Sequence, residues 1–382
     1  MTMLRFMTAG ESHGPCLIGI VDGVPAGLAL SPEHFVRDLA QRQRGYGRGG
    51  RMRIEVDAVE ILGGVVGGVT IGAPVSLRIE NRDWPNWKDK VVPPWTVARP
   101  GHVDLAGSQK YAISDMRLLA ERASARETAM RVAAGAVAKR LLGEFGIRTV
   151  SHVVAIGKAR VDATKLPSFE EIARRADASE VRCADPEAEA AMKSEIDDAK
   201  AKRDSIGGIV EVIAMGVPPG LGTHAQWDRR LDGLLAQALM SIQAIKGVEI
   251  GEGFGMVSKL GTEVHDQIYY RDGHIYRPTN RAGGIEGGIT NGEPVVVRAV
   301  MKPIPTTIAP LHSIDTATKQ EAQTQYQRSD VCAVPAASVV AEAMVAWTLA
   351  AAFADKFGGD SIAEMQRNVR GYLEAIGWSR RA

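Results

Sequence analysis

Two histidines stand in short glycine-containing segments that are typical of exposed turns. Ser12 and His13 lie within AGESHG (9–14), and His102 follows a Pro-Gly pair within RPGHVD (99–104). Because an unperturbed imidazole titrates near pH ~6.5, a histidine in such a turn can act as a general acid or base at neutral pH. A turn with a solvated histidine has the same sequence pattern. Each segment alone therefore leaves a catalytic and a structural interpretation open.

Arginines are concentrated in one glycine-rich segment, RQRGYGRGGRMR, which contains Arg42, Arg44, Arg48, Arg51 and Arg53. Guanidinium groups bind phosphate and carboxylate through forked donors, and interleaved glycines let backbone N–H groups contribute. The segment predicts a site for a small anion with two or three charges. A solvated basic loop is one alternative, and an RNA-binding segment of the RGG type is another. The chain has 46 basic and 45 acidic residues, so no overall field draws nucleic acid to it.

A second basic cluster lies in ERASARETAMRVAAG, within a helix that we predict from about residue 115 to residue 143. Arg122 and Arg126 are four residues apart and would share one helical face. Two like charges on one face destabilise a helix unless an anion or an acidic side chain lies between them. Glu121 and Glu127 are the internal candidates, so this cluster fits an anion site or a set of ordinary ion pairs.

Further along the chain, three segments combine glycine or proline with polar groups. The glycines of IQAIKGVEIGEGF and NRAGGIEGGITNGEP would let the backbone approach a flat cofactor, but no G-x-G-x-x-G follows a strand, which argues against a Rossmann site. MKPIPTT places Lys302 before a stiff proline loop. In QRSDVCAVPAAS, Arg328 and Asp330 precede a predicted helix, where a carboxylate could also serve as an N-cap.

Composition excludes several classes of protein. The 382 residues are 45% hydrophobic and 24% charged, which is ordinary for a globular chain, and three widely spaced cysteines predict neither a disulfide framework nor a zinc site. We see no signal peptide at the start and expect a cytoplasmic protein. The nearly apolar run 334–354 is long enough for a membrane span, but Glu342 and its many alanines favour a buried core helix.

Predicted strands and helices occur in clusters instead of strict alternation, which favours an α+β fold with antiparallel sheets over a doubly wound one. We expect a strand at 17–27, two or three strands within 54–80, and a buried helix from about residue 334. A highly charged helix at about 185–203 should lie on the surface. We treat residues 1–382 as a single large domain.

Taken together, the segments resemble the chorismate synthase family. The motifs that carry the resemblance run in the family's order from residue 5 to about 361: AGESHG, RGYGRGGRM, RPGHVDLAG, ERASARETAMRVAAGA, IQAIKGVEIG, TNRAGGIEGGITNG, MKPIPTT, RSDVCAVPAASVVAEAMV and KFGGDS. The resemblance implies a β-α-β sandwich of antiparallel sheets around helices, assembled as a homotetramer. It also implies a lyase that makes chorismate from 5-enolpyruvylshikimate 3-phosphate by 1,4-elimination of phosphate and a ring proton. This is the last step of the shikimate pathway, and the family requires reduced FMN.

The resemblance also implies roles for individual residues. His13 would protonate the departing phosphate, His102 would lie near the reduced flavin, and Asp330 would lie near flavin N5. Substrate contacts would come from Ser12, Arg42, Arg48, Ser124, Arg126 and Arg328. Flavin contacts would come from Arg122, Ala123, Ser124, Gln243, Ala244, Gly288, Lys302, Pro303, Ile304, Pro305, Thr306 and Arg328.

Other features of the family pattern concern the source of electrons. In the family, the positions that match Arg42 and Arg48 are associated with NADP, but we predict primarily that these two residues contact the substrate. Because the sequence has no evident flavin-reductase insertion, we expect NADPH to act only indirectly, through an external flavin reductase. Departures from the family pattern at 118–120 and 223–225 touch no residue with an assigned role.

Two other functions remain as alternatives. A flavin- or NADPH-dependent oxidoreductase that binds a similar anion would consume NADPH in proportion to product. An RNA-binding module built on residues 42–53 would bind single strands with a steep salt dependence. The lyase would form product without net oxidation of the flavin, and would need neither nucleic acid nor a membrane.

Overall fold

The structure is a computed structural model that describes residues 4–49, 55–165, 167–271, 273–327 and 329–378. Its longer strands are β1 (Arg5–Ala9), β2 (Cys16–Asp22), β3 (Val59–Gly63), β6 (Val75–Glu80), β7 (Arg148–Ile156), β9 (Gly208–Met215), β10 (Ile245–Ile250) and β15 (Val295–Met301). Its short strands are β4 (Val65–Val66), β5 (Val69–Thr70), β8 (Ala159–Arg160), β11 (Tyr269–Arg271), β12 (His274–Tyr276), β13 (Ile285–Glu286), β14 (Ile289–Thr290), β16 (His312–Asp315) and β17 (Gln320–Gln323).

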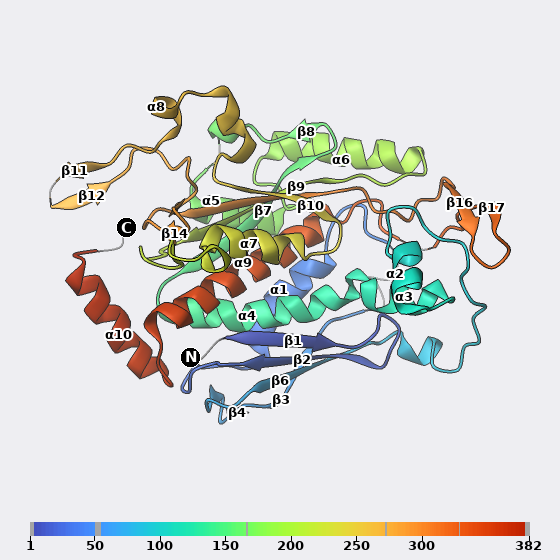
Figure 1. Cartoon of the computed structure of the whole chain (residues 1–382), viewed down its shortest axis with the longest axis horizontal. Coiled ribbons are helices and arrows are strands. Elements are labelled where there is room, and N and C mark those ends of the chain that lie inside the picture. The colour runs from blue at the N-terminus through green and yellow to red at the C-terminus, as the bar shows by residue number, and fades with distance from the viewer. Residues whose placement is uncertain (1–3, 50–54, 166, 272, 328, 379–382) are drawn as a thin grey trace.

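The strands form two antiparallel sheets on either side of a layer of helices (Figure 1). The first sheet has the order β1-β2-β6-β3, and the second has the order β10-β15-β9-β7-β8. The pairs β4–β5, β11–β12, β13–β14 and β16–β17 are separate hairpins. The helices are α1 (Glu33–Gln43), α2 (Asp104–Tyr111), α3 (Met116–Ala123), α4 (Thr128–Glu144), α5 (Phe169–Ala178), α6 (Pro186–Ala201), α7 (Leu231–Met240), α8 (Gly261–Val264), α9 (Val334–Phe357) and α10 (Ile362–Ala375).

Helices α1, α4, α7 and α9 form the middle layer (Figure 1). Helix α4 faces the first sheet, and α9 faces β7 and β9 of the second. Small residues allow the two central helices to approach closely: a Cβ on Gly135 of α4 would lie 2.4 Å from the Cβ of Ala343 in α9. The resulting apolar cluster extends from Leu4 to Val369 and contains residues of both sheets. This arrangement confirms the predicted α+β sandwich, whereas the single-domain assignment stays a prediction.

Helix α9 is the apolar run that could have been a membrane span. It is long and apolar enough to cross a bilayer, but 89% of its most apolar window is buried inside the protein. Glu342 lies in this buried stretch and pairs with Lys139 of α4. The helix therefore occupies the centre of the fold, as we expected from its internal charge.

The charged helix expected near residues 185–203 is α6, which begins after the N-cap Asp185. The Asp185 side chain accepts hydrogen bonds from the backbone N–H groups of Glu187 and Ala188. The helix lies on the outer side of the second sheet and contacts β7 and β8 (Figure 1). It still buries a narrow stripe made of Ala188, Met192, Ile196 and Ala199, which is what attaches a highly charged helix to the surface.

Two local expectations were wrong. The chain begins its described part with β1, which pairs with β2, whereas we expected the first strand at residue 17. The helix expected from about residue 115 to 143 is broken at Ser124, whose backbone is extended and whose side chain accepts a hydrogen bond from Arg126 N–H. Serine competes well for such capping positions, and the break gives α3, a short turn and α4 in place of one helix.

Candidate functional site

The segment that carries Ser12 and His13 is a tight loop between β1 and β2. Gly10 has φ of +108°, and a Cβ there would lie 2.4 Å from the carbonyl oxygen of Cys16, so only glycine fits. Asn81, just after β6, donates through Nδ2 to the carbonyl oxygens of Glu11 (3.1 Å) and Gly14 (2.7 Å). The loop that holds His13 is therefore fixed from the first sheet.

Helix α3 holds the same loop from the other side. The Glu121 carboxylate accepts from the backbone N–H of His13 at 2.8 Å and lies 2.9 Å from its Nδ1. The ring of Trp87 lies 4.0 Å from the imidazole, at a 36° tilt. Burial raises the pKa of Glu121, but the hydrogen bonds from His13 lower it more, so the pKa lies below its ordinary value. The carboxylate is therefore ionised at neutral pH. Ser12 is buried, at 3% exposure of the whole residue.

Arg42 and Arg126 are buried together around Asp57. Arg42 donates to Asp57 (3.0 Å), to the Thr128 hydroxyl (3.0 Å) and to the Ala125 carbonyl (3.1 Å). Arg126 donates to the other oxygen of Asp57. Burial lowers the pKa of Arg42 to about 10, a loss that the charge of Asp57 partly offsets, so the guanidinium stays charged at neutral pH.

Arg126 also supports the His13 loop. Its Nε donates to Oδ1 of Asn81 at 2.7 Å, and Asn81 in turn holds the carbonyl oxygens of the loop. The side chains of Arg42 and Arg126 are only 5% and 3% exposed. In this structure both arginines bind protein groups, and their direct contact with substrate stays a prediction.

The break at Ser124 separates Arg122 from Arg126, so the two do not share a helical face as we expected. Arg122 points back to β1, where it donates to the carbonyl of Thr8 at 2.9 Å and to its hydroxyl at 2.6 Å. The Thr8 hydroxyl itself donates to Glu127 at 2.9 Å. Arg126 instead turns inward to Asp57. Because the backbone is extended at Ser124, the side chain of Arg122 contacts β1 whereas that of Arg126 contacts Asp57.

Gln243 and Ala244 lie between α7 and β10, close to the start of α4. The Nε2 of Gln243 donates to Glu127 at 3.3 Å, while its Oε1 is buried with no hydrogen-bond partner among the described residues. Ala244 has φ of +66°, which is uncommon for a residue with a Cβ. The unpaired oxygen of Gln243 leaves a hydrogen bond that a ligand or an ordered water can complete.

The arginine loop and the segment before α9 meet at Asp330. Its carboxylate lies 2.8 Å from Arg48 through one oxygen and accepts from the backbone N–H of Gly49 at 2.6 Å through the other. Ser329 donates to the carbonyl oxygen of Thr306 at 2.7 Å, which brings the proline loop to the same place. Asp330 is therefore held by the arginine loop and does not act as the cap of α9, which is preceded by Ala333.

His102 belongs to a cluster of charged groups at the start of α2. Its Nδ1 makes a short contact with the carboxylate of Asp104, which also accepts from Arg99 at 2.7 and 2.9 Å. Arg99 donates further to Oε1 of Gln327. Burial raises the pKa of Asp104, but its hydrogen bonds with His102 and Arg99 lower it more, so it lies well below its ordinary value. The carboxylate thus orients both partners.

The proline loop packs against the turn that carries His102. The Lys302 amine donates to the carbonyl oxygen of Gly101 at 2.8 Å, and Ser205 donates to the carbonyl oxygen of Ile304 at 2.6 Å. Pro305 also lies against Gly101. Burial and the charge of Lys246 lower the pKa of Lys302 below its ordinary value. The loop therefore has a fixed position next to His102.

These contacts join distant parts of the sequence into a closed series at one end of the middle layer. Figure 1 shows α2 and α3 beside the N-terminal end of α4, and Gly107 of α2 lies against Leu119 of α3. The series begins at the His13 loop (10–14) and continues through Asn81, Arg126 and Asp57 to the arginine loop (42–49). From there it passes through residues 329–330 and the proline loop (302–306) to the His102 turn (99–104). The α2–α3 pair closes the series, because Glu121 of α3 contacts His13. The structure thus groups most of the residues that we singled out.

Some predicted site residues are not part of this series of contacts. Gly288 lies in the turn between β13 and β14, where its carbonyl oxygen accepts from the N–H of Leu231 at the first residue of α7. Gln243 follows the other end of that helix, so the two are about 15 Å apart along the helix axis. Arg328 lies outside the described residues, as do Arg51 and Arg53 of the arginine loop.

Four residues that hold the site together were not in our predicted set: Asp57, Asn81, Trp87 and Asp104. Glu121 was considered only as an ion-pair partner on its own helix. Asp57 and Asn81 have no local pattern that marks them, because their partners lie far away in the sequence. Asp104 has a local signal, since it stands two positions after His102 in the sequence and carboxylates commonly orient histidine rings. Among the described residues, no three His, Cys, Asp or Glu side chains are placed to hold a metal ion.

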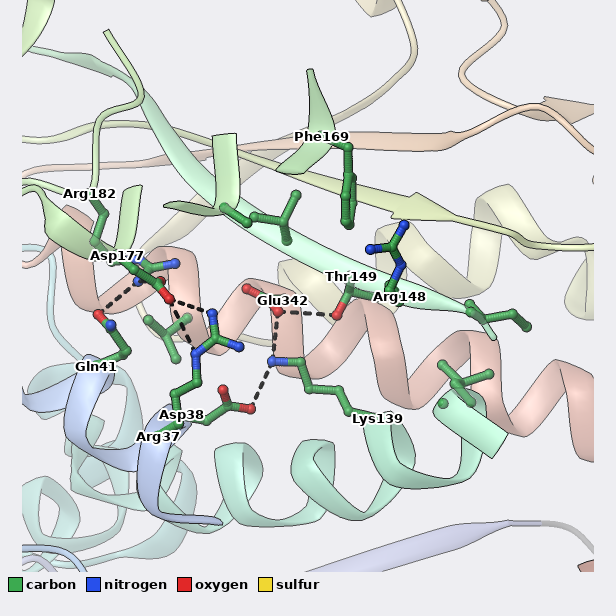
Figure 2. A pocket seen from close by; sticks show the side chains of 16 residues that line it. Arg37, Asp38, Gln41, Lys139, Arg148, Thr149, Phe169, Asp177, Arg182 and Glu342 are labelled. Atoms are coloured by element: carbon green, nitrogen blue, oxygen red, sulfur yellow. Dashed lines mark hydrogen bonds and ion pairs between the residues drawn. The ribbon is translucent and has the colours of Figure 1, made fainter. Parts of the chain in front are cut away.

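A cavity of about 310 Å³ lies apart from this series, between α1, α4, β7, α5 and α9. Figure 2 shows Lys139 between Asp38 and Glu342, at 2.7 and 2.6 Å. Burial raises the pKa of Glu342, but the charges of Lys139 and Arg182 lower it below its ordinary value. The charged groups in this cavity thus bind one another, and we treat the cavity as part of the packing between helices.

Comparison with known proteins identifies the family of the chain. The model of the family described as chorismate synthase matches residues 4–354. A curated chorismate synthase of Geobacter metallireducens is 54% identical over 98% of this chain and 99% of its own length, and one of Leifsonia xyli is 53% identical over 98% and 96%. A solved crystal structure of chorismate synthase covers 98% of both chains at 46% identity, with a TM-score of 0.81. The chain therefore belongs to the chorismate synthase family and is a lyase.

Proposed function

We propose that the protein converts 5-enolpyruvylshikimate 3-phosphate into chorismate by 1,4-elimination of phosphate and a ring proton, with reduced FMN as a required cofactor. The closed series of contacts that runs from His13 to Asp330 carries this proposal, because it places an imidazole, a carboxylate and several cations at one end of the fold. Family membership supports it. The reaction is the last step of the shikimate pathway.

His13 would supply the proton for the departing phosphate. When the C–O bond breaks, its electron pair moves to the phosphate oxygen, and a nearby acid lowers the barrier by protonating that oxygen. The loop at 10–14 is fixed by Asn81 and Glu121, so little motion would be needed at the moment of reaction. Because the general acid is already oriented before the reaction, little further entropy is lost when the transition state forms.

Cations near the loop would bind the phosphate and the two carboxylates of the substrate. Arg48 lies beside Asp330. The buried Arg42 and Arg126 add positive charge behind the site, although their donors already have protein partners. Arg328, Ser12 and Ser124 complete the set that we assign to the substrate. Stabilisation of the leaving phosphate by such fixed charges is the main electrostatic contribution that we expect.

The described residues fit a flavin. The orphaned Oε1 of Gln243, the strained turn at Ala244 and the amine of Lys302 supply donors, acceptors and backbone of the kind that binds a flat polar ring with a phosphate tail. When bound, reduced FMN supplies electron density for the elimination without net redox change. His102 would hold a proton near the ring, oriented by Asp104, and Asp330 would help to accept the ring proton of the substrate. We assign Arg122, Ala123, Gly288 and residues 302–306 to flavin contacts as well.

The first experiment is an anaerobic assay with photoreduced FMN and 5-enolpyruvylshikimate 3-phosphate, in which chorismate absorbance and phosphate release are followed together. Equal yields of both products, with the flavin still reduced at the end, would support the elimination. Oxidation of flavin or NADPH in proportion to product would favour the oxidoreductase alternative. No product, although both ligands bind, would refute the proposal.

The role of His13 has a separate test. His13→Ala should lower kcat by about 10²–10⁴-fold, because a lost general acid usually costs this much, while FMN binding stays nearly unchanged. Flavin titration monitored by fluorescence provides the binding control. Unchanged turnover would remove His13 from the mechanism without affecting the assignment of the reaction.

We also propose a cytoplasmic homotetramer that receives reduced flavin from a separate reductase, with NADPH acting only through that reductase. An exposed apolar area on the first sheet supports self-assembly: Met7 is 74% exposed and lies opposite Ile20, and Leu62 is 58% exposed. Sedimentation equilibrium tests the assembly, and a monomer at micromolar concentration would refute it. We propose no nucleic-acid partner and no membrane association.

A further inference from the structure

Glu121 contacts the His13 loop through more hydrogen-bonding atoms than an ordinary ion pair does. One carboxylate oxygen accepts from the backbone N–H of His13 at 2.8 Å, and the other lies 2.9 Å from Nδ1 of the same residue. The backbone carbonyl of Glu121 accepts from the N–H of Ser12 at 2.9 Å. The side chains of His13 and Glu121 are 26% and 15% exposed, so the contact is partly shielded from water. One residue of α3 thus fixes both the backbone and the ring of His13.

The geometry determines which ring nitrogen carries a proton. An ionised carboxylate can only accept hydrogen bonds, so the Nδ1 that faces it must be protonated. The ring of Trp87, at 4.0 Å, limits rotation of the imidazole about its Cβ–Cγ bond. Because Nδ1 is engaged by Glu121, the proton that His13 transfers is the one on Nε2.

We propose that Glu121 is a positioning residue, which holds His13 with Nδ1 protonated so that Nε2 delivers the proton to the departing phosphate. This inference rests on the role of His13 in the proposed function. In the step itself, the imidazolium loses its Nε2 proton to the phosphate oxygen that gains the C–O electron pair. The imidazole that remains is the neutral Nδ1–H form, which Glu121 stabilises by accepting its hydrogen bond. A carboxylate–histidine pair of this kind orients the ring and selects the tautomer without itself being protonated.

The test variant is Glu121→Gln, which keeps the shape of the side chain but removes its charge. A glutamine can accept through Oε1 but not through its amide nitrogen, so it cannot hold the backbone N–H and Nδ1 together. We expect kcat to fall about 10–100-fold, the usual cost of losing an orienting partner, while KM and FMN affinity change little. The matched control is Glu144→Gln, which breaks the surface pair of Glu144 with Arg140 and should leave kcat unchanged.

A double-mutant cycle separates a role through His13 from an independent one. If Glu121 acts through His13, Glu121→Gln should cost nothing further when it is added to His13→Ala. A further fall in the double variant would overturn the inference, as would full activity of the single variant. Should His13→Ala itself retain full activity, the failure would lie in the proposed role of His13 and not in the contact. Both variants are compared at the same folded fraction, measured by circular dichroism.

A second variant keeps the inference testable where the glutamine variant folds poorly. Glu121→Asp retains the charge but is shorter by one methylene, so it can hold one of the two contacts of His13. Its kcat should lie between the values of the wild type and of His13→Ala, with KM unchanged. Full wild-type activity would overturn the inference, because it would show that catalysis does not need both contacts between the carboxylate and His13.

Discussion

Asp57→Asn is the substitution that most directly tests how the buried arginines are held. Asp57 is fully buried at the side chain and accepts from Arg42 at 3.0 Å and from Arg126 through its other oxygen. The change is isosteric, but it leaves two buried guanidinium groups that share one neutral amide. Asn81 and the carboxylate of Glu55, 3.7 Å from Arg126, remain as partners.

The magnitude follows from the number of charged hydrogen bonds that are lost. Each hydrogen bond to a charged group contributes about 1.5–3 kcal/mol, and removing one partner of a buried ion pair usually costs about 3–5 kcal/mol. We therefore expect the free energy of unfolding to fall by about 3–5 kcal/mol. Because Arg126 also holds Asn81 and thereby the His13 loop, kcat should fall as well.

The assay is urea unfolding followed by tryptophan fluorescence at a fixed protein concentration, with activity measured on the same preparations. Glu60→Gln is the control, because Glu60 pairs with Arg78 at the surface, where such a pair contributes at most about 1 kcal/mol. Adding Arg42→Met to Asp57→Asn should recover part of the loss, since it removes one uncompensated charge. A loss below about 1 kcal/mol for Asp57→Asn would refute the view that this carboxylate neutralises the two arginines.

Three further outcomes are expected. Gly10→Ala should lower the free energy of unfolding by about 2 kcal/mol or more, because Gly10 has a positive φ and lies close to Cys16. Gly371→Ala in α10, which has open space around it, should instead stabilise the protein by at most about 1 kcal/mol. Thermal unfolding compares the two variants, and equal effects would contradict this prediction. In the folded protein the pKa of Asp104 lies below its ordinary value of 3.8, so its stabilising contribution is complete above pH 3.8 and is lost as the pH falls through the folded pKa. Asp104→Asn should therefore be less stable than the wild type at pH 7 and should lose less stability on acidification. An unchanged pH dependence would contradict the ion-pair assignment. Lys302→Met should weaken FMN binding at least tenfold in a fluorescence titration, and unchanged affinity would remove its amine from the flavin site.

Much of the fold followed from local patterns. Clustered strands predicted antiparallel sheets, and the internal Glu342 predicted that 334–354 is a core helix. Local patterns failed where a polar residue decides between two conformations. The helix expected across residue 124 is broken because the Ser124 hydroxyl caps the following turn, and helical periodicity does not report this competition.

The sequence also indicates some residues of the candidate site and not others. Histidines in glycine turns and arginines in a glycine-rich loop have short signatures, so the sequence alone singles out His13, His102 and Arg48 as candidates. Asp57 and Asn81 have no such signature, because each is defined by a partner 69 or 67 residues away along the chain. Which arginine meets an anion and which is neutralised internally depends on those distant partners.

Residue types and their order were enough to establish the class of fold, the family and the kinds of chemical groups that the site contains. These properties depend on local periodicity and on short motifs, which a linear chain displays directly. Only the tertiary structure decided that Arg42 and Arg126 share Asp57, that Arg122 turns to β1, and that Glu121 fixes the ring of His13. Electrostatic and hydrogen-bond partnerships act over a few ångströms of space, and folding determines which residues come within that distance.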